Sequence, residues 1–309
     1  MRILVATDFS VRSHRALRRA GLLAGPRRGK LMPMHVVEGL GTRQVAQDLR
    51  EAQRMILEQV AVVPELFRAW CEPIVIGGDP AGAVLDAANA WEVDLIVVGA
   101  SSDSPERTSG ETLKTLVRAS PCPVLVVRQP VEGPYRRVLA PVDLSDTSTR
   151  ALRRVGSLGL ADDALVTVLH AFRAPATTKL WAAGISQEHL DGYVESCRTG
   201  FAEELDGVLA REGLGRRDWR RRVEEGWPRD VIPRIAMECR ADLVAVGTHG
   251  RTGLARALRG SVAEDLLSTP GPDVLVVPPP RRTPGRPTWL RSGSSRSPDG
   301  QPAPGIAVT

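Results

Sequence analysis

Short apolar runs alternate with longer amphipathic stretches along most of the chain. In its first part, runs of Ile, Leu and Val predict five strands, at residues 2–7, 30–38, 72–78, 94–100 and 123–129. Apolar residues at helical spacing predict helices between them, as in SVRSHRALRRAGLLA and DPAGAVLDAANAWE. Near-continuous apolar strands are typical of sheets covered on both faces, and their alternation with helices indicates a parallel sheet.

This pattern occurs twice in the chain. Asp8–Arg19 and Asp143–Arg154 agree at eight of twelve positions, and the same offset of 135 residues brings His35 onto His170. Later segments match at offsets of 148 and then 150 residues, so the second copy is the longer one. Thirteen of its extra residues are expected within 180–222, a stretch that ends in the arginine-rich REGLGRRDWRRR.

The repeat predicts two tandem Rossmann-like α/β domains, each an open parallel five-stranded sheet flanked by helices. We place them at residues 1–129 and 135–278, and a chain of 309 residues lets each bury its own core. Residues 279–309 are rich in Pro, Gly, Ser and Arg and lack any period, which predicts a disordered basic tail.

The charge distribution makes a nucleic-acid partner unlikely. The formal net charge is +5, but residues 281–309 hold five arginines and one aspartate, which accounts for +4 of it. A basic arm for an anionic partner stays open as an alternative for the tail. No apolar run is long enough to span a bilayer, and Met1 leads directly into RILVAT, so we expect a cytoplasmic protein without membrane attachment.

The cysteines are scattered and form no C-x-x-C pair. Their surroundings in the sequence are apolar or helical. This pattern predicts buried free thiols rather than a disulfide framework or a zinc site. The four residues are Cys71, Cys122, Cys197 and Cys239.

Two features of each copy point to one ligand crevice. In a parallel α/β sheet, ligands bind beyond the carboxyl ends of the strands, where the strand order reverses. Asp8 and Asp143 follow the first strand of each copy, and Gly99 and Gly247 end the fourth. If those strands are neighbours, each aspartate and its glycine open onto the same crevice.

The second copy carries a glycine-rich loop, VGTHGRTGLARALRGSV, at residues 246–262. Gly247 and Gly250 would let the chain turn through backbone angles that other residues avoid, bringing bare amides close to a ligand. Gly260 and Ser261 precede VAEDLLS, a helical stretch whose free N–H groups and positive dipole would favour an anion. The loop therefore predicts a phosphate site.

The sequence resembles the universal stress proteins, in particular the tandem members with two such domains in one chain. Gly247, Gly250, Gly260 and Ser261 match the nucleotide-binding loop of that family, G-x2-G-x9-G-[S/T]. The aspartate after strand one, the histidine segment of strand two and the closing VLVV strand add to the resemblance, which covers both domains and leaves the tail outside.

The resemblance implies ATP binding in the second domain, with Mg²⁺ or Mn²⁺ bridging the phosphates, although no residue stands out as a dedicated metal ligand. Carried onto this chain, adenine and ribose would lie near Pro141, Val142, Asp143 and Ala171. The phosphates would be held by the loop residues Gly247, Thr248, His249, Gly250, Arg251, Gly260, Ser261 and Val262.

Simpler roles are open to several of these residues. Asp143 could cap the following turn, and His170 is better explained as a hydrogen-bonded core residue than as a catalytic one. His249 could be an exposed loop histidine. Arg251 and Arg256 could neutralise phosphate or belong to a solvated face.

The first copy departs from the loop motif. Ser102 stands where the second glycine should be and Glu111 where the serine should be, and the loop is two residues shorter. Glu111, together with Asp103 and Glu106, adds negative charge where phosphate would have to bind. We expect the first copy to keep the fold and to bind ATP weakly or not at all.

Members of the resembled family commonly pair through the last strand. The closing strands of the two copies, PVLVVRQ and DVLVVPP, are therefore expected to meet as an internal pseudo-dimer, with a further homo-oligomer left open.

The sequence favours an ATP-binding stress-response protein with a regulatory or signalling role over an enzyme. It contains no P-loop, no G-x-G-x-x-G fingerprint and no nucleophile with its base. A slow ATP hydrolase is one alternative, with His249 or Asp143 as the residue that orients water. The other is a nucleotide-independent interaction module that uses residues 216–222 or the tail.

Overall fold

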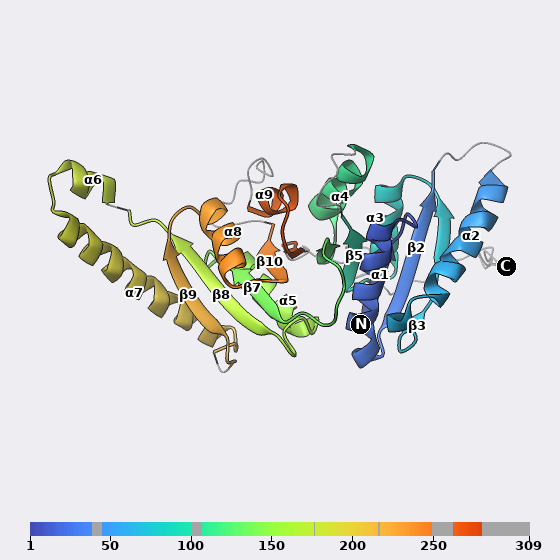
Figure 1. Ribbon diagram of the computed structural model, residues 1–309, viewed down its shortest axis with the longest axis horizontal. Coiled ribbons are helices and arrows are strands. Elements are labelled where there is room, and N and C mark those ends of the chain that lie inside the picture. Colours follow the sequence, from blue (N-terminus) through green and yellow to red (C-terminus); the bar gives the residue numbers. More distant parts are fainter. Residues whose placement is uncertain (39–44, 101–106, 176, 216, 249–261, 280–309) are drawn as a thin grey trace, which may run out of the picture. The chain divides into compact units, whose positions relative to one another are not determined.

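The computed structural model describes residues 1–38, 45–100, 107–175, 177–215, 217–248 and 262–279. Apart from Pro279, the predicted tail lies outside these residues. The described chain consists of two halves of the same architecture that share one sheet (Figure 1).

The first half alternates strands and helices in the predicted order. Two short 3₁₀ turns, Gly25–Arg27 and Pro64–Leu66, lie between its larger elements. Those elements are β1 Arg2–Ala6, α1 Val11–Ala24, β2 Lys30–Val37, α2 Val45–Ala61, β3 Trp70–Cys71, β4 Ile74–Gly77, α3 Pro80–Ala90, β5 Leu95–Gly99, α4 Arg107–Ala119 and β6 Val124–Val127.

Among the described elements, the second half repeats this order with one additional helix and without counterparts of β3 and of the two 3₁₀ turns. The elements of this half are β7 Arg137–Pro141, α5 Asp146–Ser157, β8 Leu165–Phe172, α6 Thr177–Ala182, α7 Gln187–Arg211, β9 Arg220–Glu225, α8 Pro228–Glu238, β10 Leu243–Gly247, α9 Val262–Ser268 and β11 Asp273–Val277.

All described strands belong to one 11-stranded sheet, in the order β3-β2-β1-β5-β6-β11-β10-β7-β8-β9, with β4 also paired to β2. Every strand pair is parallel except β6 with β11, which is antiparallel. The predicted fold class is confirmed, and so is the meeting of the two closing strands. The sheet is therefore continuous from one half into the other.

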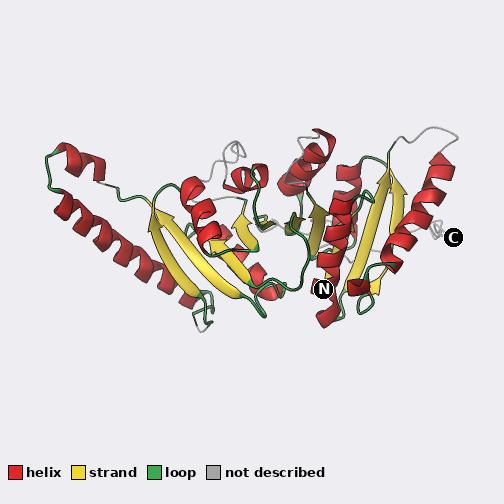
Figure 2. Cartoon of the chain, viewed as in Figure 1, coloured by secondary structure: helices red, strands yellow, loops and turns green. Residues whose placement is uncertain are grey.

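A separate hydrophobic layer covers each face of this sheet, with the helices packed outside it (Figure 2). Ile3 and Val5 belong to the layer that also contains residues of α1, α5 and α7, whereas Leu4 belongs to the layer of α3, α4, α8 and α9. Leu275 and Val276 are divided in the same way in the second half. Because strand side chains alternate between faces, each layer extends across the β6–β11 junction.

The extra residues of the second copy form α6 and lengthen α7. Helix α7 has 25 residues, whereas its counterpart α2 has 17. Helix α6 begins at Thr177, slightly before the stretch in which the extra residues were expected. The inserted segment leads into β9, the outermost strand of this half.

Strand β9 carries the last three arginines of the arginine-rich run, and Arg221 and Arg222 among them lie in ion pairs. Arg222 contacts both Glu224 and Glu238 at 2.6 Å, and Arg234 of α8 contacts the same two carboxylates at 3.1 and 2.9 Å. Burial would raise the pKa of Glu224, but its hydrogen bonds from Arg222 and Arg234 outweigh that effect and lower the pKa. These arginines are therefore partnered within the chain.

A serine caps the helix after the first strand of each half. Ser145 Oγ accepts a hydrogen bond from the Ser148 N–H of α5, as Ser10 Oγ does from Ser13 in α1. Replacing Ser145 with alanine should lower the free energy of unfolding by about 1 kcal/mol, because a first-turn N–H loses its acceptor. Urea denaturation measures this, with Ser157→Ala at the other end of α5 as the control. An equal loss in both variants would contradict the capping role.

Candidate functional site

The strand order of the second half reverses between β7 and β10. The chain passes from β7 to β8 and β9 on one side and then returns to β10 on the other side, where β10 pairs with β7. Asp143 and Gly247 therefore lie at the carboxyl ends of adjacent strands, as expected from the sequence. The first half has the same arrangement, because β1 pairs with β5. Ligands of open α/β sheets bind at such a reversal.

Asp143 holds the start of helix α5. Its Oδ1 accepts hydrogen bonds from Ser145 Oγ at 2.5 Å and from the Ser145 N–H at 3.2 Å. Asp8 makes the same two bonds to Ser10, at 2.5 and 3.0 Å. Burial would raise the pKa of Asp8, but hydrogen bonds from the nearby serines outweigh it and lower the pKa. The turn-capping role that the sequence left open for Asp143 is thus present in the structure.

The histidine of strand two is a hydrogen-bonded core residue in the second half, as predicted. His170 is 5% exposed, its Nδ1 lies 2.9 Å from the Val142 carbonyl oxygen, and its ring centroid lies 5.0 Å from that of Phe201. His35 makes the equivalent bond in the first half, at 2.8 Å, but its aromatic neighbour is Phe9, at 4.3 Å. The same histidine therefore has a different aromatic neighbour in each half.

Gly99 and Gly247 serve the packing of a helix against the sheet. Neither has a positive φ, so the expectation that Gly247 turns the chain through angles reserved for glycine is wrong. A Cβ on Gly99 would lie 2.2 Å from the Arg12 backbone oxygen, and one on Gly247 would lie 3.2 Å from that of Thr147. The missing side chain lets the first turn of α1 or α5 approach the strand end.

The other described site residues lie around this crevice. Pro141 ends β7 and is partly buried, and Ala171 lies near the end of β8 and is also partly buried. Val142 is 5% exposed, its side chain belongs to the core, and its N–H donates to the Leu169 oxygen. Thr248 donates its N–H to the β11 residue Val277, and Val262 begins α9. The remaining predicted residues, His249, Gly250, Arg251, Gly260 and Ser261, lie outside the described chain.

A hydrogen-bond network follows the first strand of the first half, at a position where the second half has an apolar side chain. Thr7 occupies the position of Val142 and donates from Oγ1 to Gln59 Oε1 of α2 at 2.8 Å. Its Oγ1 also lies 3.0 Å from Ser13 Oγ and accepts the Phe9 N–H at 3.1 Å. The sequence did not predict this hydrogen-bond network, although the first copy has Thr where the second has Val, and that difference could have indicated it.

Glu111 lies inside helix α4 rather than directly before a helix. Helix α4 begins at Arg107, so both Gly110 and Glu111 are helical. Glu111 is exposed and pairs with Lys114 at 2.9 Å, and the hydrogen bond from Lys114 lowers the pKa of Glu111. Of the acidic residues predicted to repel phosphate in the first half, Asp103 and Glu106 lie outside the described chain.

Within the described chain, no cluster of three or more His, Cys, Asp or Glu side chains could hold a metal ion. None of the four cysteines is joined in a disulfide, as predicted, but only Cys122 is buried and the other three are partly exposed. Burial raises the pKa of Cys71 to about 11. No helix in the described ranges combines the length and apolarity needed to cross a membrane.

Sequence comparison shows that the chain belongs to the universal stress protein family, whose profile matches residues 1–128 and 134–278. The universal stress protein E homolog of Haemophilus influenzae is 31% identical over 174 residues, which cover 54% of this chain and 55% of that relative. Universal stress protein MJ0531 of Methanocaldococcus jannaschii is 30% identical over 155 residues, covering 49% of this chain and 86% of that protein.

Solved structures match nearly the whole chain. PA1789, a functionally unknown protein from Pseudomonas aeruginosa, is 25% identical with a TM-score of 0.58, covering 90% of this chain and 92% of its own. A universal stress protein from Archaeoglobus fulgidus has a TM-score of 0.63 over 90% of this chain and 98% of its own. Because its identity is 18%, that likeness concerns the fold alone.

Proposed function

We propose that this universal stress protein binds ATP in its second half and acts in stress-response regulation or signalling without rapid catalysis. The observation that carries the proposal is the coincidence of two features at one place. The strand order reverses between β7 and β10, and the complete G-x2-G-x9-G-S sequence begins at the end of β10. The second half alone has that complete sequence.

Adenine and ribose would bind beside Asp143 and Ala171, with Pro141 and Val142 forming the end of β7 next to them. Both Asp143 and Ala171 are partly buried, as a site wall should be. The phosphates would lie along Gly247–Val262, where backbone amides offer hydrogen bonds without adding charge. Mg²⁺ or Mn²⁺ would be held mainly by the phosphates, since the sequence offers no dedicated ligand.

The hydrogen bonds of Asp143 agree better with a regulatory role of the protein than with ATP hydrolysis. Its Oδ1 already accepts two hydrogen bonds from Ser145, which fix the carboxylate at the start of α5. A group in that position is suited to orienting bound ribose rather than to activating water. His249 is the other residue that a slow hydrolase would use.

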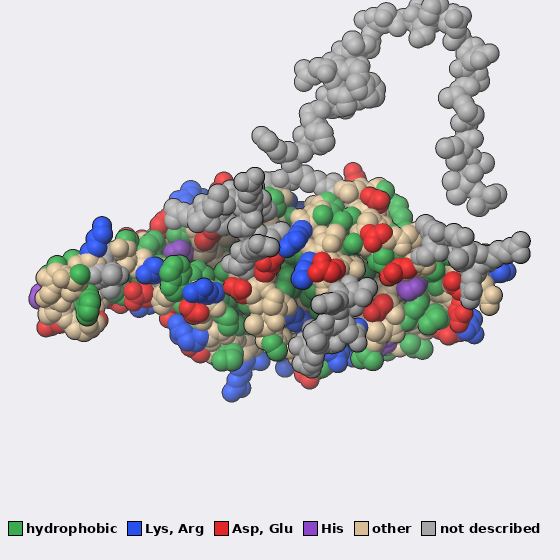
Figure 3. All heavy atoms as spheres, turned by 90° about the horizontal axis from the view of Figure 1, so that it is seen from above, with side chains coloured by type: hydrophobic (Ala, Val, Ile, Leu, Met, Phe, Trp, Pro, Cys, Tyr) green, Lys and Arg blue, Asp and Glu red, His purple; other side chains and the backbone are tan. Residues whose placement is uncertain are grey.

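The surface charge gives no support to a nucleic-acid partner. On the face shown in Figure 3, Lys and Arg side chains are interspersed with Asp and Glu. Arg222 and Arg234 are paired with glutamates, and Arg221 with Asp206 at 2.9 Å. An interaction module built on the arginine-rich run would first have to break these contacts.

Thermal unfolding with and without millimolar ATP and Mg²⁺ tests the proposal. ATP at one hundred times its dissociation constant should stabilise the protein by about 2.7 kcal/mol, since it binds only the folded state. Gly250→Asp should abolish the shift, because its carboxylate repels phosphate. Ser102→Asp places the same charge at the matching position of the first half and should leave the shift intact.

The outcomes separate the candidate functions. An absent shift in the unmodified protein, or an equal shift in Gly250→Asp, would refute nucleotide binding at this loop. Phosphate release measured in parallel should stay near background. Clear turnover that His249→Ala abolishes would favour the slow hydrolase.

A further inference from the structure

The two closing strands are almost identical in sequence. Strand β6 contains Val-Leu-Val-Val at 124–127, and β11 contains the same four residues at 274–277. They pair in antiparallel register, with Leu125 opposite Leu275. These side chains alone would not distinguish β6–β11 pairing within one chain from β6–β6 or β11–β11 pairing between two chains.

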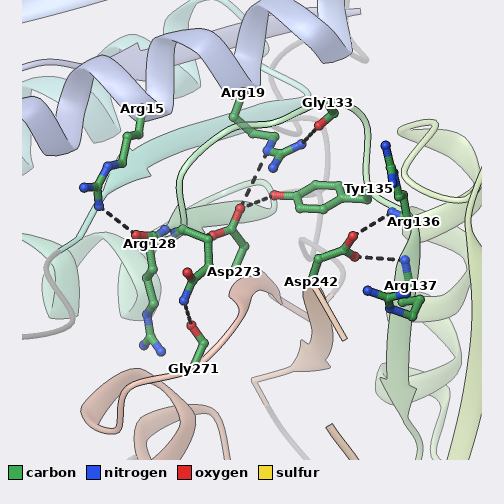
Figure 4. Close-up of polar contacts among 11 residues, drawn as sticks. Arg15, Arg19, Arg128, Gly133, Tyr135, Arg136, Arg137, Asp242, Gly271 and Asp273 are labelled. Carbon is green, nitrogen blue, oxygen red and sulfur yellow. Dashed lines mark hydrogen bonds and ion pairs between the residues drawn. The ribbon is translucent and has the colours of Figure 1, made fainter. Parts of the chain in front are cut away.

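One end of the junction carries a polar network around a fully buried carboxylate, Asp273 (Figure 4). Its Oδ1 accepts the backbone N–H groups of Arg128 at 2.8 Å and Gln129 at 3.0 Å. Its Oδ2 accepts the Tyr135 hydroxyl at 2.6 Å and lies 3.6 Å from Arg19 Nε. The acceptor thus comes from the second half, as does Tyr135, whereas the two backbone donors and Arg19 come from the first half.

The remaining contacts reinforce this end of the junction. The Arg19 guanidinium lies 3.8 Å from the centroid of the Tyr135 ring and donates to the Gly133 oxygen at 2.6 Å. Arg15 of α1 donates to the Arg128 backbone oxygen at 3.0 Å. Burial raises the pKa of Asp273, although its hydrogen-bond donors and Arg19 oppose that change. Such a carboxylate is stable only while its donors are present.

Among the described residues, the opposite end of the junction has no equivalent network. By the repeat, Pro123 stands in the position of Asp273, and Pro278 and Pro279 stand in the positions of Arg128 and Gln129. Proline has no backbone N–H to donate. The pseudo-twofold relation between the halves is therefore broken in the residues that flank the paired strands.

This asymmetry penalises the pairing of like strands. In a β11–β11 pair, the Asp273 of each chain would face Pro278 and Pro279 of the other and lose both backbone donors. In a β6–β6 pair, the amides of Arg128 and Gln129 would face Pro123, which offers them no carboxylate. A buried carboxylate without donors is costly, so each wrong pairing is disfavoured.

We propose that Asp273 is a specificity residue that makes the closing-strand interface heterotypic, so that β6 and β11 of one chain pair with each other and not with like strands of a second copy. The acceptor lies on one strand and its amide donors directly after the other. Pro123, Pro278 and Pro279 exclude the reciprocal arrangement, in which β6 would carry the acceptor and β11 would be followed by the amide donors.

Refolding of the full chain tests this proposal. Molar mass is measured by light scattering before and after unfolding and refolding at high protein concentration, with the unmodified chain as reference. Pro278→Ala combined with Pro279→Ala leaves every contact of Asp273 intact and gives β11 two backbone donors. We expect this double variant to gain a species of twice the reference mass that persists on dilution.

Two single variants accompany it. Asp273→Ala should also gain the double-mass species, because its own β6–β11 pairing loses its advantage. Asp242→Ala, which removes a partly buried carboxylate that accepts two backbone N–H groups, should refold to the reference mass. A double proline variant that refolds only to the reference mass overturns the proposal, whether or not Asp273→Ala folds. An equal gain in Asp242→Ala overturns it as well.

Discussion

Asp273→Ala should lower the free energy of unfolding by about 3–5 kcal/mol, the largest effect that we expect from a single side chain here. The alanine leaves Arg19 buried at 4% exposure without its carboxylate. It also leaves the N–H groups of Arg128 and Gln129 and the hydroxyl of Tyr135 without their acceptor. Arg19, Arg128 and Tyr135 are buried, so hydration does not compensate for the bonds that they lose.

Chemical denaturation of the full chain measures this loss, with Asp242→Ala as the matched control. The Asp242 carboxylate also accepts two backbone N–H groups, from Arg136 at 2.7 Å and Arg137 at 3.0 Å, but Asp242 is only partly buried and both bonds are open to solvent. Water can replace it, so the control should lose only about 1 kcal/mol. Equal losses in the two variants would show that burial of the Asp273 network contributes nothing beyond its hydrogen bonds.

Gly99→Ala should destabilise the protein by about 3 kcal/mol, because the new methyl group would meet backbone atoms that cannot rotate away. Its Cβ would lie 2.2 Å from the Arg12 oxygen, 2.4 Å from the Arg12 carbonyl carbon and 2.8 Å from the Ser13 nitrogen. Relief requires helix α1 to move off the sheet, which opens the core beneath it.

Two other glycines calibrate this result in the same denaturation experiment. Gly247→Ala should cost about 1 kcal/mol, since its new Cβ would lie 3.1 Å from the Thr147 methyl carbon and 3.2 Å from the Thr147 backbone oxygen, much farther than the 2.2 Å at Gly99. Gly110→Ala has no atom within 4 Å of the new Cβ and lies in helix α4, so it should stabilise by up to about 1 kcal/mol. If Gly99→Ala costs no more than Gly247→Ala, close packing does not explain the first glycine.

Gly99 and Gly247 also show what the repeat could and could not predict. Both copies keep glycine at the end of the fourth strand, and the packing of α1 or α5 is sufficient reason for it. The later members of the loop motif, Gly250 and Ser261, have no counterpart in the first copy, so packing does not require them there. Sequence spacing could identify the motif, but it could not separate a packing glycine from a ligand-binding one.

Strands, helices and the meeting of the closing strands were predictable because each follows from local apolar pattern and from the repeat. The network around Asp273 could not be predicted from the sequence, since it joins Arg19 and Tyr135 to a residue more than a hundred positions away. The exchange of Pro123 for Asp273 between copies was visible in the sequence. Its meaning depended on the register of β6 against β11, which only the structure supplies.

The charged strand β9 also bears on the solubility of the protein. Because β6 and β11 pair with each other, the strand at the second half's open edge of the sheet is β9, with the sequence RRRVEE. An unpaired edge can add strands from other molecules and start aggregation, and a row of charges discourages that addition. The charges of β9 therefore disfavour the addition of a foreign strand at this edge.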